Sequence, residues 1–186
     1  MKLLSIILSI LSSFFANLET KTVQSDYVAT VEENGVKQDY PGSITMKGEL
    51  FLLTMSGHHV AFDGKTMYTY SEETDELTLT EPQEEELTET NPLLYAKAVA
   101  EVCAITEETS KDGTQTIVTL TPHDQTQGVN RFVLKIRNAD LMPLEVEVKE
   151  SLQRTILKFT NPAYISTPVT FTIEPDETTF VNDLRL

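Results

Sequence analysis

Apolar and polar residues alternate through most of the chain after about residue 22. Residues 144–150 read Leu-Glu-Val-Glu-Val-Lys-Glu, and residues 132–137 alternate in the same way. A period of two is typical of a β-strand that buries one face and exposes the other to solvent. Runs rich in β-branched residues predict further strands, at 28–31, 42–46, 116–121, 154–159 and 170–173.

Short turn sequences separate these predicted strands. They include Asn34-Gly35, Pro41-Gly42, Ser56-Gly57, Asp63-Gly64 and Asp112-Gly113. Many short strands with turns this close together are typical of an antiparallel sheet, sandwich or barrel, and not of alternating strands and helices. The pattern therefore predicts a mainly β domain of the α+β class, in which the strands follow one another as a meander.

Two segments depart from the alternation. Asn91-Pro92 is a typical N-cap followed by proline at the first helical position, and it predicts a helix to about Cys103, preceded by a short helical turn over 84–89. Because this helix is apolar almost all round, we expect it to lie across a sheet face or at the mouth of a barrel. Residues 50–55 are apolar on both faces, which fits a strand that closes a cavity or a fully buried core strand.

The N-terminal residues form a separate apolar segment. Lys2 precedes an uninterrupted run of apolar and small residues from Leu3 to Ala16. This run is shorter than the roughly 20 residues that cross a membrane, and it matches the apolar core of a secretory signal. We therefore expect residues 1–16 to be a signal peptide and residues 17–186 to form a single exported domain. The alternative is a helix retained in the folded protein.

The charge balance narrows the partners that the protein can have. The chain holds 29 acidic and 14 basic side chains, a formal net charge of -15, which argues against nucleic-acid binding. Nine of the acids fall between Lys65 and Lys97, where no base occurs. This acidic run either steers a basic partner or only keeps the surface soluble. The single cysteine, Cys103, cannot form an internal disulfide, and we expect it to pack as a small apolar residue.

Motifs for catalysis or cofactor binding are missing from the sequence. There is no P-loop, no glycine-rich dinucleotide motif and no Gly-x-Ser-x-Gly. His58 and His59 are adjacent, so on a strand they would point to opposite faces and could not bind one metal ion. We therefore expect no cofactor, no metal and no catalytic residues. A hydrolase would need a polar cleft with converging acid and base groups.

Residues 62–71, Phe-Asp-Gly-Lys-Thr-Met-Tyr-Thr-Tyr-Ser, resemble the Asp-Gly-Lys turn and aromatic-rich strand of the periplasmic lipoprotein carrier (LolA-like) family. A strand that starts at Gly42, the apolar strand 50–55 and a helix that starts Asn91-Pro92-Leu93-Leu94 stand around this motif in the order of that family. Residues 171–183 resemble its closing pattern F-x-x-x-P…V-x-D.

The resemblance implies an open, incomplete antiparallel β-barrel made of one strongly curved sheet, with short helices forming a lid over an apolar cavity. It also implies a monomeric periplasmic carrier that shelters the acyl chains of lipoproteins, or another lipid-like ligand, between an inner-membrane release complex and an outer-membrane receptor. By this match, the cavity candidates are Phe51, Leu53, Met55, Phe62, Tyr68, Tyr70, Phe132, Leu134, Leu144 and Val146. The lid candidates are Leu93, Leu94 and Val99.

One departure from the family pattern concerns control of the lid. The family commonly has a basic residue and a proline before its Phe-rich strand, and an arginine that ties the barrel to the lid. Here the matching stretch holds Lys47 without arginine or proline, and lysine lacks the planar fork of donors that arginine supplies. The chain thus fits a divergent member of the family. The alternative function is a β-rich periplasmic sensor or interaction domain of the same fold that shuttles no lipid.

Overall fold

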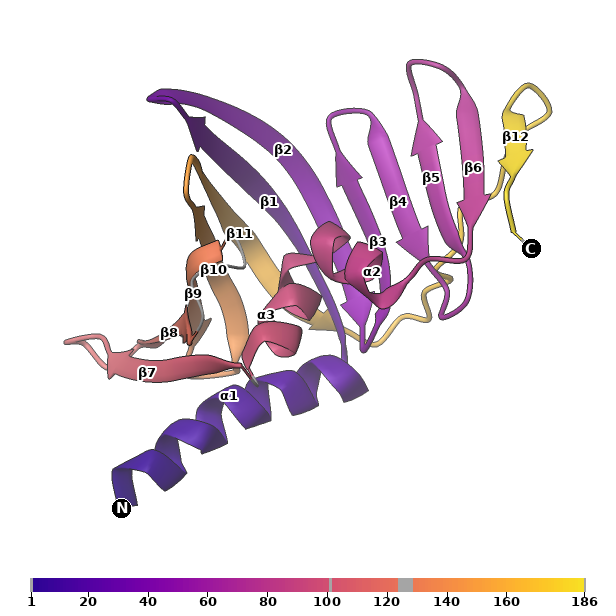
Figure 1. Cartoon of the computed structure of the whole chain (residues 1–186). Coiled ribbons are helices and arrows are strands. Elements are labelled where there is room, and N and C mark those ends of the chain that lie inside the picture. Colours follow the sequence, from indigo (N-terminus) through magenta and orange to yellow (C-terminus); the bar gives the residue numbers. More distant parts are fainter. Residues whose placement is uncertain (1, 101, 124–128, 186) are drawn as a thin grey trace.

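The computed structural model describes residues 2–100, 102–123 and 129–185, with side chains from residue 10 onward (Figure 1). The helices are α1 (Lys2–Thr20), α2 (Glu84–Thr90) and α3 (Pro92–Ala100). The strands are β1 (Thr22–Glu33), β2 (Val36–Lys47), β3 (Leu50–Met55), β4 (His58–Phe62), β5 (Met67–Ser71), β6 (Glu76–Thr80), β7 (Cys103–Thr109), β8 (Gln115–Pro122), β9 (Val129–Arg137), β10 (Met142–Glu150), β11 (Gln153–Ile165) and β12 (Phe180–Asp183).

The twelve strands in the described part of the chain belong to one sheet, in the order β12-β6-β5-β4-β3-β2-β1-β11-β10-β9-β8-β7. Neighbouring strands are antiparallel except for β12, which pairs in parallel with β6. The sheet curves strongly, with α2 and α3 on its concave side and α1 beneath its lower end (Figure 1). Its two edge strands, β12 and β7, do not pair with each other. The predicted mainly β fold with an open, unclosed sheet is therefore confirmed.

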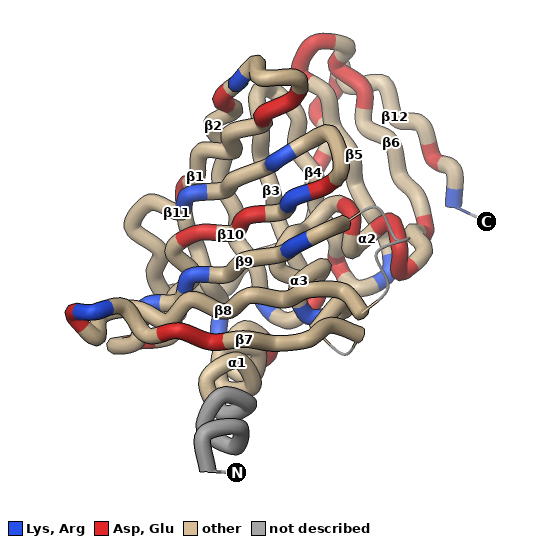
Figure 2. The backbone as a smooth tube through the Cα atoms, turned by 60° about the vertical axis from the view of Figure 1, so that its left-hand side comes forward, with Lys and Arg blue, Asp and Glu red and all other residues tan. Residues whose placement is uncertain are grey.

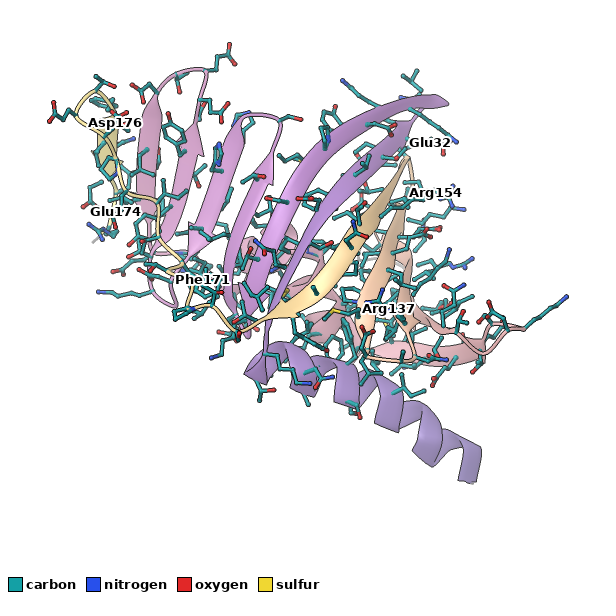
Figure 3. All side chains as sticks on the ribbon, turned by 180° about the vertical axis from the view of Figure 1, so that it is seen from behind. Glu32, Arg137, Arg154, Phe171, Glu174 and Asp176 are labelled. Carbon is teal, nitrogen blue, oxygen red and sulfur yellow. The ribbon has the colours of Figure 1, made fainter. Side chains whose placement is uncertain are left out.

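The two faces of the curved sheet differ in polarity because the side chains of each strand alternate. On β1, Val23, Tyr27 and Ala29 are buried on the concave side. Charged pairs occupy the convex side, where the Nε and Nη2 of Arg154 donate to Glu147 at 3.2 and 2.9 Å. Figure 3 shows Arg154 and Glu32 on this outer face. The concave side thus supplies the core and the apolar surface on which the helices rest.

Helices α1 and α3 pack apolar residues into the same core. The buried side chains are Leu11, Phe14 and Leu18 from α1 and Leu93, Leu94 and Ala96 from α3. The end of α1 is attached to the sheet by the backbone, since the Gly48 N–H donates to the Leu18 carbonyl at 2.6 Å. As described, α1 continues without a break past residue 16. None of the described helices combines the length and the apolar character needed to cross a membrane.

The start of α3 confirms the cap that the sequence predicts. The Asn91 side-chain oxygen accepts a hydrogen bond from the Leu93 N–H at 3.0 Å, and Pro92 occupies the first helical position. The helix ends earlier than expected, at Ala100, because Cys103 already begins strand β7 and pairs with Pro122 on β8. Cys103 is buried as expected, and this burial raises the pKa of its thiol.

The predicted strand over 170–173 is wrong. The segment between β11 and β12 crosses behind the sheet, as Figures 1 and 3 both show. The chain must cross the sheet because β11 lies beside β1, whereas β12 lies at the far edge beside β6. Phe171, within this crossing segment, is buried with 8% exposure. Leu77 and Leu79 on β6, the strand next to β12, are buried as well. The apolar residues of 170–173 therefore pack against a face of the sheet and do not pair as a strand.

Candidate functional site: an apolar groove on the concave face

An open groove of about 1130 Å³ lies between the concave face of the sheet and helices α2 and α3. This volume is slightly above the roughly 300–1,000 Å³ that is typical of small-molecule sites. The sheet contributes a mainly apolar floor from β1, β2, β3, β10 and β11, made of Tyr27, Ala29, Val31, Tyr40, Leu53, Met55, Val148 and Leu157, with the polar residues Gln153 and Thr155 at the β11 side. Helix α3 contributes an apolar wall of Pro92, Tyr95, Ala98 and Val99.

One border of the groove is acidic. Three carboxylates, Glu84, Glu85 and Glu89, come from α2, and Glu150 comes from the end of β10. Helix α2 has no fully buried side chain, and among its residues the half-buried Leu87 packs against the core. The described lining residues include no lysine or arginine. The groove thus combines an apolar floor with a negatively charged border.

Tyr27 fixes the floor of the groove at the point where β1, β2 and β3 meet. Its hydroxyl donates to the Thr54 carbonyl at 3.0 Å, and its ring meets Phe159 edge-on at a centroid distance of 6.4 Å. Gly42 is its cross-strand partner, and the absence of a side chain there leaves room for the ring. Burial raises the pKa of Tyr27 to about 12, so its hydroxyl remains a neutral donor at physiological pH.

Gly42→Ala is expected to lower the free energy of unfolding by about 2–3 kcal/mol, because a Cβ would approach the Thr54 carbonyl oxygen to 2.2 Å and the Tyr27 ring to 2.5 Å. Urea denaturation measures this loss. Tyr27→Phe is the matched control: it removes only the hydroxyl and should cost about 1 kcal/mol. A Gly42→Ala variant as stable as the parent protein would contradict this close packing.

Three of the residues predicted from the sequence line the groove: Leu53 and Met55 on β3, and Val99 on α3. A second group lies in the closed part of the core and has at most 9% exposure: Phe51, Phe62, Phe132, Leu134, Val146, Leu93 and Leu94. The strand residues of this group face the concave side beneath the helices, and Leu93 and Leu94 pack onto the same core from α3. The structure therefore divides the predicted cavity into an open groove and a filled core.

The remaining predicted cavity residues lie outside the groove. Tyr68 and Tyr70 on β5 point to the convex side, since they alternate with Met67, which pairs with Phe62 and belongs with it to the core on the concave side. Their hydroxyls donate to Asp63 at 3.0 Å and to Asp75 at 3.2 Å. Leu144 is half-buried beside an irregularity in the β9–β10 pairing, where it belongs to neither the groove nor the main core cluster.

Sequence reasoning missed several residues of the floor, above all Tyr27, Ala29 and Val31 on β1. Their spacing of two along one strand is a signal that places them on one face. The spacing does not tell which face is concave. Val148 and Leu157 come next to them only because β1 pairs with β11, which pairs with β10.

The expected tie between lid and sheet at Lys47 is replaced by an ion pair between two helices. Lys47 is exposed and joins no ion pair among the described residues. Instead, Lys97 on α3 forms an exposed ion pair with Glu19 on α1. Exposed pairs of this kind are worth about 1 kcal/mol or less. The ion pair therefore adds little to the apolar packing that holds α1 and α3 in the same core.

Other chemistry around the groove is limited. Within the described ranges, no three His, Cys, Asp or Glu side chains come together to hold a metal ion. A second, polar hollow of about 450 Å³ lies by the β1–β2 and β10–β11 turns, and its Arg154 is already bound to Glu147 and 3.8 Å from Glu32. The groove is thus the site with the surface to accept an apolar ligand.

Comparison with known proteins supports the fold at low sequence identity. No family model and no curated protein sequence matches the chain. An uncharacterized conserved protein from Thermus thermophilus aligns with a TM-score of 0.63 at 16% identity, covering 94% of this chain and 97% of that one. This likeness concerns the fold alone.

Two more distant structures also align over most of the chain. A LolA superfamily protein from Nitrosomonas europaea gives a TM-score of 0.42 at 10% identity, covering 86% of this chain and 94% of that one. LprF from Mycobacterium bovis gives 0.46 at 13% identity, covering 91% and 97%. Both likenesses are at low sequence identity.

Proposed function

We propose that this protein binds the acyl chains of lipoproteins, or another lipid-like ligand, in the groove and carries them through the periplasm toward the outer membrane, without catalysing a reaction. The observation that carries the proposal is the apolar groove of about 1130 Å³ beneath α2 and α3. The order of LolA-like motifs along the sequence supports the same assignment. An inner-membrane release complex and an outer-membrane receptor would be the partners at the two ends of the route.

A carrier must gain enough free energy on burying the acyl chain to hold it, and it must also be able to release the chain. Burying a 15-methylene chain gains about 12 kcal/mol at about 0.8 kcal/mol per methylene. Release needs the helices to move away from the floor at low cost. Helix α2 has no fully buried side chain and reaches the core through the half-buried Leu87, whereas α3 is held by its buried residues Leu93, Leu94 and Ala96. Weakly attached elements open most readily, so α2 is proposed as the moving part of the lid.

Export would bring the protein to its ligand. Residues 1–16 are proposed to be a signal peptide, which would be removed in the periplasm of a Gram-negative type envelope. Cleavage there would leave Leu18 and Glu19 at the start of the mature chain and remove Leu11 and Phe14 from the core. The contacts of Leu18 and Glu19 with the sheet and with α3 would remain available.

Native mass spectrometry of protein purified from the periplasm tests the proposal. We expect co-purified acyl-bearing ligand, or one-to-one uptake of a synthetic triacylated peptide, because the groove can accept chains without rearrangement of the core. An Ala98→Trp variant should reduce uptake, since Ala98 is exposed within the groove wall. Ala139→Trp, at an exposed position outside the groove, is the control. Absence of both ligand and uptake would contradict the carrier function.

A further inference from the structure

We propose that the acylated ligand of this groove is a polypeptide segment with basic residues next to its acyl chain. The inference rests on the proposed function and specifies the chemistry of its ligand. It comes from the pairing of an apolar floor with a border of carboxylates in one groove. The acyl chain would lie along the floor, and the lysine or arginine side chains that follow it would face α2 and the end of β10.

The carboxylates on this border are available to a ligand. Glu84, Glu85, Glu89 and Glu150 take part in no ion pair with any described residue. Like charges placed together on a surface repel one another, and a cationic partner relieves that repulsion. A groove that is apolar in its floor and negative along one border is therefore complementary to a ligand that is both apolar and positive.

Helix α2 by itself does not explain this arrangement. Acidic residues in the first turn, such as Glu84 and Glu85, stabilise the positive end of the helix dipole. Glu89 lies in the last turn, where the dipole disfavours a negative charge. Glu89 nevertheless lines the groove, whereas Glu86 of the same helix does not. The positions of the border carboxylates thus match the groove and are not explained by the helix dipole alone.

The acidic run between Lys65 and Lys97 separates into two surfaces in the fold. Glu72, Glu73, Asp75 and Glu76 lie at the β5–β6 hairpin, and the other members lie on or just before α2. Figure 2 shows these acidic segments apart from each other. Only the part on α2 meets the apolar floor. Net charge explains acidic residues anywhere on the surface, but it does not select those that border a groove.

The spacing of the carboxylates favours a segment with several charges over a single cationic head group. Glu84 and Glu89 are five residues apart, which corresponds to about 7.5 Å along a helix. Glu150 extends the negative border to the end of β10, although Arg131 and Lys149 lie near it in the polar hollow. One ammonium group could face only part of this border, whereas consecutive basic residues could face all of it.

Three N-palmitoylated peptides test the inference, with four lysines, four serines or four glutamates after the acylated residue. Isothermal titration calorimetry at 50 mM NaCl should give at least tenfold tighter binding of the lysine peptide than of the serine peptide, and weaker binding still of the glutamate peptide. Raising the salt to 500 mM should reduce the preference for lysine, because exposed charges are screened. Hexadecyltrimethylammonium supplies a matching chain with a single charge and should bind more weakly than the lysine peptide.

The variant E84Q/E85Q/E89Q should lose most of the preference for lysine while it keeps its affinity for the serine peptide. The retained affinity shows that the groove is intact. E73Q/E174Q/E177Q removes the same charge from exposed positions outside the groove and should keep the preference. Equal binding of all three peptides would overturn the inference and leave the carrier function standing. Equal binding of the alkylammonium and the lysine peptide would overturn the assignment to a polypeptide, and binding of none would overturn the carrier function itself.

Discussion

Replacing Val31 with glutamate is expected to weaken the binding of a palmitoylated peptide at least 100-fold, which corresponds to about 2.8 kcal/mol. Val31 is half-buried and lies on the groove floor, where its neighbours across the sheet are Thr155 and Gln38. A carboxylate there must either lose its water when the acyl chain enters or keep its water and exclude the chain. Both outcomes remove much of the apolar contact that drives binding.

Val28→Glu provides a matched control on the same strand. Val28 is 38% exposed and points to the convex face, where Lys158 is its cross-strand partner. The substitution is chemically identical and alters the same strand, so it should leave the affinity within about twofold of the parent protein. Calorimetry with the palmitoylated serine peptide measures both variants. If Val31→Glu and Val28→Glu bound the peptide equally well, the groove would not be the acyl-binding site.

Replacing Phe14 with alanine in the 186-residue chain is expected to lower the free energy of unfolding by about 3–5 kcal/mol. The Phe14 side chain has no exposed surface and belongs to the main core cluster together with Leu11 and Leu18. Its removal leaves a cavity that the surrounding sheet can close only in part. Urea denaturation of the chain produced without export measures the loss. Ser13→Ala, at an exposed position of the same helix, should change stability by less than about 0.5 kcal/mol.

The same substitution separates the two roles that α1 can have. If residues 1–16 are removed on export, as proposed, Phe14→Ala should have no effect on the stability of the periplasmic protein. N-terminal sequencing of that protein identifies its first residue independently. A periplasmic protein that begins at Met1 and is destabilised by Phe14→Ala would show that α1 is a structural helix and would contradict the signal peptide.

The secondary structure could be predicted from short-range physical preferences. Alternation identified the strands that became β9 and β10, β-branched content identified part of β11, and the Asn91-Pro92 cap identified the start of α3. These features depend on neighbouring residues only. Residues 170–173 were wrongly predicted to form a strand. Their apolar alternation is equally compatible with a strand and with a segment that packs across a sheet face. Strand β7 was missed because the apolar residues of α3 continue to Val102 and Cys103, which hid the end of the helix.

The candidate site could be predicted only in part. Leu53 and Met55 line the groove, whereas Phe51 on the same face of β3 is fully buried, one step nearer the Gly48 turn where α1 packs. Nothing within the strand distinguishes these residues, because all three occupy equivalent positions of the alternation. What separates them is how far the helices extend over the concave face.

The sequence by itself determined the succession of strands and turns, the cap that begins α3 and the concentration of acidic residues before it, because each depends on residues close together in the chain. Only the tertiary structure decided which apolar face is concave, which strands meet at the floor and which carboxylates border it. Those properties depend on pairing register and sheet curvature. A shift of register by one residue would turn every side chain of a strand to the opposite face, so the groove is a property of the assembled sheet.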